Sequence, residues 1–300
     1  MSITVTNISK SYKSVKALED ISFEVKEGEL FGLIGPDGAG KTTLFRILTT
    51  LLFANEGTAT VAGFDVLTDY KKIRNSVGYM PGRFSLYQDL TVEENLTFFA
   101  TIFGTTIEEN YDLIKDIYVQ IEPFKDRRAG KLSGGMKQKL ALSCALIHKP
   151  KVLFLDEPTT GVDPVSRKEF WDMLKRLQQK GITILVSTPY MDEAALCDRI
   201  ALIQNGKILK IDTPQAIVKH YPKPIYNVRA SNMYQLINSL NAYKHKHSVY
   251  PFGEFVHYTD NRLDFNPTEL IQYLESEKLV DITISKTEPT IEDTFMELAK

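Results

Sequence analysis

The sequence predicts an α/β fold built around a parallel β-sheet. Residues 29–50 supply the first observation, because an apolar strand, a glycine-rich loop and a helix of periodic apolar residues follow one another there. Residues 151–158 supply the second, an apolar strand that ends in the consecutive carboxylates Asp156 and Glu157. Such a strand brings acidic groups to the C-terminal edge of a parallel sheet, which is where ligands bind.

The composition is that of an ordinary soluble globular protein, since 43% of the 300 residues are hydrophobic and 25% are charged. This length suits one large domain or two modest ones. The formal net charge of −2 gives no electrostatic reason to expect nucleic acid or anionic lipid as a partner. Cys144 and Cys197 fit no metal or disulfide spacing, so a reduced cytosolic setting is the simplest account. No apolar run approaches the ~18 residues of a membrane span, and no signal-type core follows Met1.

The glycine-rich loop GPDGAGKT fits the phosphate-binding pattern G-x-x-x-x-G-K-[ST] at every fixed position. Its glycines let backbone N–H groups turn inward, and the helix that begins near Gly40 adds free N–H groups and the positive end of its dipole. We expect Lys41 to reach the β- and γ-phosphates and the Thr42 hydroxyl to ligate Mg²⁺. An ordinary glycine-rich turn is the alternative, which the agreement of strand, loop, lysine and helix disfavours. The predicted nucleoside triphosphate site comprises Gly35, Pro36, Asp37, Gly38, Ala39, Gly40, Lys41, Thr42 and Thr43.

The residues before this loop are rich in β-formers. Residues 2–8 and 21–34 alternate or are apolar, with Glu27 and Gly28 as a turn within the second stretch. Tyr12 lies between the two stretches. It either stacks on a purine base or is a surface tyrosine in a hairpin, and its spacing alone does not decide between these interpretations.

A helical insert follows two short strands, over residues 57–63 and 77–81. Residues 91–103 carry apolar side chains at helical spacing, and Thr91 with Glu94 has the form of a capping box. Residues 107–121 predict a second amphipathic helix, ended by Pro123. This predicts a helical region between two α/β portions.

The sequence LSGGMKQ at residues 132–138 opens another helix, which runs to about His148. Ser133 is the predicted N-cap, followed by glycines where helix N–H groups are free. The segment is either a plain helix cap or a second anion-binding helix end, and taken alone it is a weak signal.

The two carboxylates at the end of the strand over residues 151–158 have separate predicted roles. Successive strand residues point to opposite sides, so Asp156 and Glu157 can take different tasks. Asp156 would hold Mg²⁺ through its water shell, and Glu157 would orient or deprotonate the attacking water. Two acids at a solvated strand end are the alternative, which the intact phosphate loop disfavours. A helix after residues 161–164 (GVDP), a strand at 182–187 and a hairpin with Asn205-Gly206 at its turn complete this part.

The chain beyond residue 220 predicts a small α+β module, after a linker over residues 219–224 that contains two prolines. We expect strands at 226–230, 254–258 and 279–285 and helices at 233–240, 267–275 and 290–298. His245 and His247 lack further metal ligands, so a solvated basic patch is the preferred interpretation over a metal site. The region carries no catalytic constellation, and a docking or regulatory role is the default.

Taken together, GPDGAGKT, LSGGMKQ shortly before LFLDEP, and GVDP just after it resemble the ATP-binding cassette (ABC) family, the ATPase subunits of ABC transporters. The resemblance covers residues 1 to about 220, and the ending EPTIEDTFMEL is similar to the C-terminal ends of drug- and antibiotic-export cassettes. It implies a P-loop NTPase cassette at 1–220, with a parallel-sheet core, an antiparallel β subdomain and a helical subdomain at about 83–148. A small α+β accessory domain would occupy residues 221–300.

The resemblance also implies ATP and Mg²⁺ as ligands and a head-to-tail dimer of two cassettes. Tyr12 takes the place of the family's adenine-stacking aromatic, and Asp163 would lie at the dimer interface. The signature residues Ser133, Gly134 and Gly135 would face the γ-phosphate bound by the opposite chain. The segment from Phe84 to Leu90 would receive a coupling helix from a separate membrane permease. Its apolar side chains, Phe84, Leu86 and Tyr87, suit an exposed partner contact, although core packing explains them equally well.

Two positions depart from the family's pattern. Gly82 stands where the family usually has glutamine, and Pro189 stands where it usually has a histidine that contacts the γ-phosphate. Glycine has no side chain and proline no backbone donor, so neither can do that work directly. We therefore expect ATP binding and dimer closure to persist, with slow hydrolysis at the chain's own phosphate loop.

The sequence thus predicts a cytoplasmic ATPase subunit of an exporter, peripheral on the inner face of the cell membrane through its permease. The first alternative is a nucleotide-gated regulatory cassette that barely hydrolyses ATP and completes the site of a different cassette. The second is a soluble ABC protein that acts on nucleic acid or ribosomes, disfavoured by the single cassette, the near-neutral charge and the permease-type loop. The substrate, the direction of transport, and a homodimer or heterodimer arrangement are left open.

Overall fold

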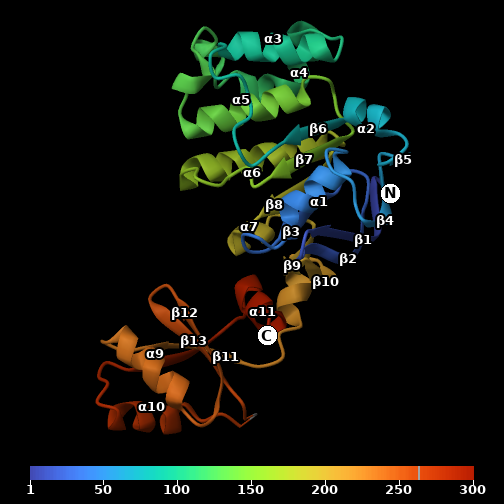
Figure 1. Ribbon diagram of the computed structural model, residues 1–300. Coiled ribbons are helices and arrows are strands. Elements are labelled where there is room, and N and C mark those ends of the chain that lie inside the picture. The colour runs from blue at the N-terminus through green and yellow to red at the C-terminus, as the bar shows by residue number, and fades with distance from the viewer. Residues whose placement is uncertain (263) are drawn as a thin grey trace. The chain divides into compact units, whose positions relative to one another are not determined.

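The computed structural model describes residues 1–262 and 264–300, and the chain divides into two compact units. The first unit spans Met1–Gln215 and the second spans Ala216–Leu298. Helix α8 (Pro214–Lys219) carries the chain across this division. Figure 1 shows the elements of both units.

The first unit contains two β-sheets. A six-stranded sheet has the order β10-β9-β3-β8-β7-β6, in which every neighbouring pair is parallel except β10 with β9. Its strands are β3 (Leu30–Ile34), β6 (Val77–Met80), β7 (Val152–Asp156), β8 (Thr183–Thr188), β9 (Arg199–Gln204) and β10 (Lys207–Asp212). A four-stranded antiparallel sheet has the order β2-β1-β4-β5. Its strands are β1 (Ile3–Tyr12), β2 (Val15–Val25), β4 (Glu56–Val61) and β5 (Phe64–Asp65).

Helix α1 (Lys41–Leu48) packs against strands of both sheets. Its apolar residues Leu44, Phe45 and Leu48 are fully buried in one core with side chains from each sheet. Phe45 meets Phe154 of β7 edge to face, with ring centroids 5.9 Å apart. Strands β3 and β7 are buried along their whole length, which explains their continuous apolar sequences.

Helices α3 (Val92–Ile102), α4 (Ile107–Tyr118) and α5 (Gly134–Leu146) form the predicted helical group, drawn in teal to green in Figure 1. Thr91 and Glu94 make both hydrogen bonds of the predicted capping box. The prediction that Pro123 ends the second helix is wrong, because α4 ends at Tyr118 and Pro123 lies in the 3₁₀ turn η1 (Glu122–Phe124). Helices α2 (Tyr70–Ser76), α6 (Pro164–Gln179) and α7 (Met191–Ala194) and the turn η2 (Ala129–Lys131) complete the unit.

The second unit has the order βαββαβ followed by one further helix. Its sheet order, β12-β13-β11-β14, with all neighbours antiparallel, is the ferredoxin-like arrangement. The elements are β11 (Ile225–Arg229), α9 (Met233–Ala242), β12 (Lys246–Phe252), β13 (Phe255–Asp260), α10 (Pro267–Ser276), β14 (Thr283–Thr287) and α11 (Ile291–Leu298). Helices α9 and α10 share a core with one face of this sheet, including Leu240, Tyr258 and Leu274.

Three details of the sequence prediction differ in this unit. Strand β12 was not predicted, and β14 begins later than the predicted strand over 279–285. The prediction of a solvated basic patch is wrong for His247, because its side chain is half-buried and hydrogen-bonded to Glu297 at 3.0 Å.

Candidate functional site

The phosphate loop joins the end of β3 to the start of α1, as the sequence predicts. Gly38 and Gly40 have φ values of 79° and 104°, which glycine adopts without the strain that other residues incur. A Cβ on Gly35 would lie 2.1 Å from the Ile203 carbonyl oxygen, and one on Gly40 would lie 2.4 Å from that of Ala17. The close approach of neighbouring backbone is therefore enough to require glycine at residues 35 and 40, whether or not a phosphate is bound.

Lys41 is the centre of the site, although its side chain is only 3% exposed. Its ammonium donates hydrogen bonds to the carbonyl oxygens of Gly35, at 2.8 Å, and Pro36, at 3.0 Å. It also lies 3.1 Å from the Glu157 carboxylate. A buried cation needs such partners, and here the loop itself and the predicted catalytic acid provide them.

Asp156 and Glu157 have different surroundings, but strand alternation is the wrong reason. Asp156 is the last residue of β7, is 2% exposed and accepts a hydrogen bond from the Ser187 hydroxyl at 2.7 Å. Glu157 lies beyond the strand with a φ of 51°, so the turn rather than the pleat sets its direction. Its backbone N–H donates to both the carbonyl and the hydroxyl of Ser187 at 3.1 Å. A strained residue held by its neighbours at a sheet edge is typical of a functional position.

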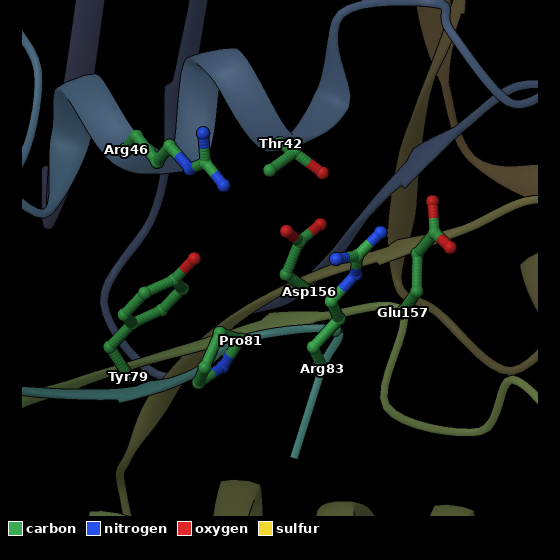
Figure 2. Close-up of a pocket in the computed structure, with 8 residues that line it drawn as sticks. Thr42, Arg46, Tyr79, Pro81, Arg83, Asp156 and Glu157 are labelled. Carbon is green, nitrogen blue, oxygen red and sulfur yellow. The ribbon is translucent and has the colours of Figure 1, made fainter. Parts of the chain in front are cut away.

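A cavity of about 580 Å³ opens beside these carboxylates. The residues that line it are Thr42, Arg46, Tyr79, Pro81, Gly82, Arg83, Asp156 and Glu157. Figure 2 shows Thr42 and Arg46 extending from α1, with Thr42 facing Asp156 and Arg46 above Tyr79. Burial and the negative charge of Asp156 raise the pKa of the Tyr79 hydroxyl to about 12. The cavity thus joins two carboxylates, two guanidinium groups and two hydroxyl groups from three separate parts of the chain.

Behind the site lies a buried network that the sequence analysis missed. Glu193 of α7 is 2% exposed and accepts hydrogen bonds from the hydroxyl groups of Thr159 and Thr188. Arg167 of α6 adds an ion pair with Glu193 at 3.1 Å, and its guanidinium lies over the Tyr190 ring. The Thr188 carbonyl in turn accepts from the Gly35 N–H at 3.3 Å. The network connects β8, α6, α7 and the phosphate loop, and no local sequence pattern indicates it.

Of the predicted phosphate-loop residues only Thr42 lines this cavity, and the predicted site residues Tyr12, Ser133, Gly134, Gly135 and Asp163 do not line it either. Tyr12 ends β1 with 43% of its surface exposed. Ser133 caps α5 by accepting from the Met136 N–H, and Asp163 caps α6 by accepting from the N–H groups of Val165 and Ser166. Those hydrogen bonds, from Ser166 first, hold the pKa of the Asp163 carboxyl below its usual range. Gly135 lies beside Ser166, whose hydroxyl oxygen would be 3.0 Å from an added Cβ, so the starts of α5 and α6 adjoin.

The predicted partner segment is only partly exposed. Tyr87 is 51% exposed and Phe84 is half-buried, whereas Leu86 is buried, so for Leu86 the core-packing interpretation holds and the exposed partner contact is wrong. Leu86 and Ser85 line a second cavity of about 460 Å³ in this unit, together with Phe99 and Phe103 of the helical group. Asn95 of α3 hydrogen-bonds the backbone N–H and carbonyl of the adjacent Tyr87, which holds this segment against the helical group.

Comparison with known proteins now defines the family. The sequence profile of the ABC transporter family matches residues 18–160. The Nod factor export ATP-binding protein I of Rhizobium sp. (strain N33) is 32% identical over 302 residues, which cover 99% of this chain and 97% of that protein. The chain belongs to the ABC transporter ATP-binding proteins. The predicted family and fold class are therefore confirmed.

Other members of the ABC family are more identical over a shorter stretch. The probable multidrug ABC transporter ATP-binding protein YbhF of Escherichia coli (strain K12) is 42% identical over 71% of this chain, but the match spans only 37% of the length of YbhF. The doxorubicin resistance ATP-binding protein DrrA of Mycobacterium tuberculosis (strain CDC 1551 / Oshkosh) is 38% identical over 73% of this chain and 68% of its own length. The substrates that these names mention, such as doxorubicin, are those of the relatives.

Solved ABC cassettes share the fold of this chain. The cbiO1 protein from Clostridium perfringens, part of the cbiONQ transporter complex, has a TM-score of 0.65 and 27% identity over 73% of this chain and 91% of its own. The MJ0796 cassette, solved as a dimer after hydrolysis with ADP and Pi, has a TM-score of 0.64 and 26% identity over 70% of this chain and 98% of its own. ABC cassettes bind ATP, form dimers and are ATPases coupled to transport. The predicted enzyme class, a transport-coupled ATPase, is therefore confirmed.

The residues of this ABC cassette fit a magnesium-bound triphosphate. The Lys41 ammonium supplies positive charge at the base of the loop, and Thr42 and Asp156 present oxygen atoms, which Mg²⁺ prefers, on one cavity. Within the described residues, no helix has both the length and the apolar character that crossing a bilayer requires.

Proposed function

We propose that this cassette binds and hydrolyses ATP to drive export of a substrate through a separate membrane permease. One observation carries the proposal: Thr42, Asp156 and Glu157 line one cavity, and Lys41 pairs with Glu157 at its edge. Thr42 and Asp156 would hold Mg²⁺, and Lys41 would bind the phosphates. Because Lys41 pairs with Glu157 at 3.1 Å, a lysine that turns to phosphate would leave the Glu157 carboxylate available to orient or deprotonate water.

The proposed site is completed by a second cassette, of the same or a different sequence. Ser133 and Gly135 open α5, and Asp163 caps the adjoining α6. These residues do not line the cavity that holds Asp156 and Glu157. The N–H groups at the start of α5 suit an anion from the opposite chain, since a helix N-terminus favours negative charge.

The proposed permease contact is the segment from Phe84 to Leu90, together with the second cavity that Ser85 and Leu86 line. The nearby apolar side chains of Leu51, Tyr87 and Ile102 are all more than half exposed. A partly apolar hollow next to the exposed Tyr87 side chain suits a short helix of a partner. This arrangement would place the protein at the inner face of the membrane through its partner, in the cytoplasm.

Hydrolysis at this chain's own site is proposed to be slow. Gly82 lines the cavity without a side chain, and Pro189 follows Thr188 with neither a side-chain nor a backbone donor. Losing one polar contact to a transition state commonly lowers a rate by about 10²–10³-fold. These two positions favour the second candidate function, a regulatory cassette that closes on ATP and turns it over little.

The test is ATP turnover by the purified chain, compared with a Glu157→Gln variant and a Gly82→Gln/Pro189→His double variant. A Cβ on residue 82 would lie 3.0 Å from the Asp156 carbonyl oxygen, so Gly82→Ala is the matched control for that crowding. We expect low native turnover, a gain in the double variant, and no gain with Gly82→Ala. Brisk native turnover that Glu157→Gln abolishes would refute the slow site and support an ordinary motor.

A further inference from the structure

Arg83 is a cation at the edge of the cavity that holds Asp156 and Glu157. It lines the cavity with Thr42, Asp156 and Glu157, and in Figure 2 its side chain extends between the two carboxylate side chains. Within the described parts of the chain, Arg83 has no ion pair within 4.0 Å. An arginine left unpaired next to two acids is available for another anion.

The nearby carboxylates already have other partners. Glu157 pairs with the Lys41 ammonium at 3.1 Å, and Asp156 accepts from the Ser187 hydroxyl at 2.7 Å. The acidic groups and Arg83 therefore share one cavity without neutralising one another directly. The charge that would satisfy all of them is a metal-bound anion: the metal for the carboxylate oxygen atoms and the anion for the guanidinium.

The backbone before Arg83 explains how it reaches this position. Gly82 follows the end of β6 so closely beside β7 that a Cβ would lie 3.0 Å from the Asp156 carbonyl oxygen and 3.8 Å from the Glu157 Cβ. Glycine permits this approach, and the next residue, Arg83, then extends into the cavity from the same turn. Residue 82 thus places no side chain at this edge of the cavity, and residue 83 places a cationic one there.

We propose that Arg83 binds the terminal phosphate of a nucleoside triphosphate in this site. It supplies from residue 83 a polar contact that Gly82 and Pro189 cannot make. A guanidinium presents several N–H donors in a planar fork that matches phosphate oxygens, which an ammonium group does not. This inference rests on the proposed function, because it requires that the phosphate loop bind a nucleoside triphosphate.

The test measures equilibrium affinities for ATP and ADP with Mg²⁺, using the full chain in a Glu157→Gln background that suppresses turnover. Because ADP lacks the terminal phosphate, its affinity is an internal control for folding and for the rest of the site. Arg83→Ala should weaken ATP binding about tenfold and ADP binding less than about twofold. Arg83→Lys should lie between, since it keeps the charge and loses the fork.

Arg128→Ala is the matched charge control, since Arg128 is exposed and does not line the cavity. It should change neither affinity by more than about twofold. Equal losses for ATP and ADP in Arg83→Ala, or no loss for either, would overturn the role of Arg83 while leaving the proposed function standing. A parent chain that binds neither nucleotide would overturn both.

Discussion

The phosphate loop requires glycine at residues 35 and 38 for different structural reasons. Gly35 is packed so closely against β9 that an added Cβ would meet the Ile203 carbonyl oxygen at 2.1 Å. Gly38 has open space around the Cβ position and a φ of 79°. The first glycine therefore serves the packing of the sheet, and the second serves the conformation of the loop.

Gly35→Ala should consequently cost more stability than Gly38→Ala. Since backbone must move to accept the methyl group, we expect Gly35→Ala to lower the free energy of unfolding by about 3 kcal/mol. Gly38→Ala should cost about 1 kcal/mol, the strain of a left-handed conformation. Urea unfolding monitored by fluorescence measures both. Equal losses in the two variants would contradict the packing role of Gly35.

At the scale of elements, the end of β8 connects the parts of the site. Ser187 contacts both carboxylate residues, and the Thr188 carbonyl accepts from the phosphate loop. The Thr188 hydroxyl donates to Glu193, which also pairs with Arg167 of α6. Pro189 has no N–H to donate. The hydrogen bonds of Ser187 and Thr188, including the one that Glu193 of α7 accepts, hold this segment in place.

The Arg167 side chain makes one buried and one exposed ion pair, which gives a matched comparison. Glu193 is 3% exposed in its side chain, whereas Asp192 is 74% exposed. Arg167→Ala should lower the free energy of unfolding by about 1–3 kcal/mol, because it leaves a buried carboxylate with fewer donors. Asp192→Asn should cost less than about 1 kcal/mol.

A double-mutant cycle separates these two interactions. The coupling free energy between Arg167 and Glu193, from urea unfolding of Arg167→Ala, Glu193→Gln and the double variant, should exceed that between Arg167 and Asp192. A coupling near zero for the buried pair would show that Arg167 stabilises the segment by another contact, such as its stacking on Tyr190.

At the scale of the whole molecule, the second unit has its own polar centre. His257 of β13 hydrogen-bonds Asp293 of α11 at 2.7 Å, and both side chains are almost fully buried. Burial alone would raise the pKa of the Asp293 carboxyl, but hydrogen bonds from His257 and Thr290 outweigh it and hold that pKa below its ordinary value of 3.8. The pair fastens α11 to the sheet of this unit.

Asp293→Asn should therefore destabilise the second unit at neutral pH, by about 3 kcal/mol. A lowered pKa in the folded state means that the contribution of the Asp293 carboxylate is present above pH 3.8 and is lost as the pH falls through the lower folded value. Hydrogen exchange of β13 and α11 at neutral and acidic pH would measure it. Glu254→Gln, which changes the exposed ion pair with Arg229, is the control and should have little effect. A difference between variant and parent that grows in acid would contradict this account.

Local patterns in the sequence determined much of the first unit. The strand, loop and helix around Lys41, the Thr91 capping box and the Asn205-Gly206 hairpin each depend on residues within a few positions, so they could be predicted without a fold. The paired acids, the phosphate loop and the signature also identified the family, since their order along the chain is specific. Strand β12 escaped prediction because it is an edge strand with Pro251 and mixed polar residues, and pairing with β13 gives it its form.

Only the tertiary structure decided the contacts between distant segments. Arg83 shares a cavity with the carboxylates because β6 and β7 are neighbours in the sheet, although helices α3, α4 and α5 all lie between these strands in sequence. Leu86 is buried and lines a cavity with residues of the helical group. Glu193 accepts hydrogen bonds from Thr159, Thr188 and Arg167, which lie in three separate segments. The turn at Glu157 sets the direction of its side chain. Periodicity and motif spacing report what a residue does to its near neighbours, whereas burial, ion pairing and the shape of a cavity depend on which strands and helices the fold places side by side.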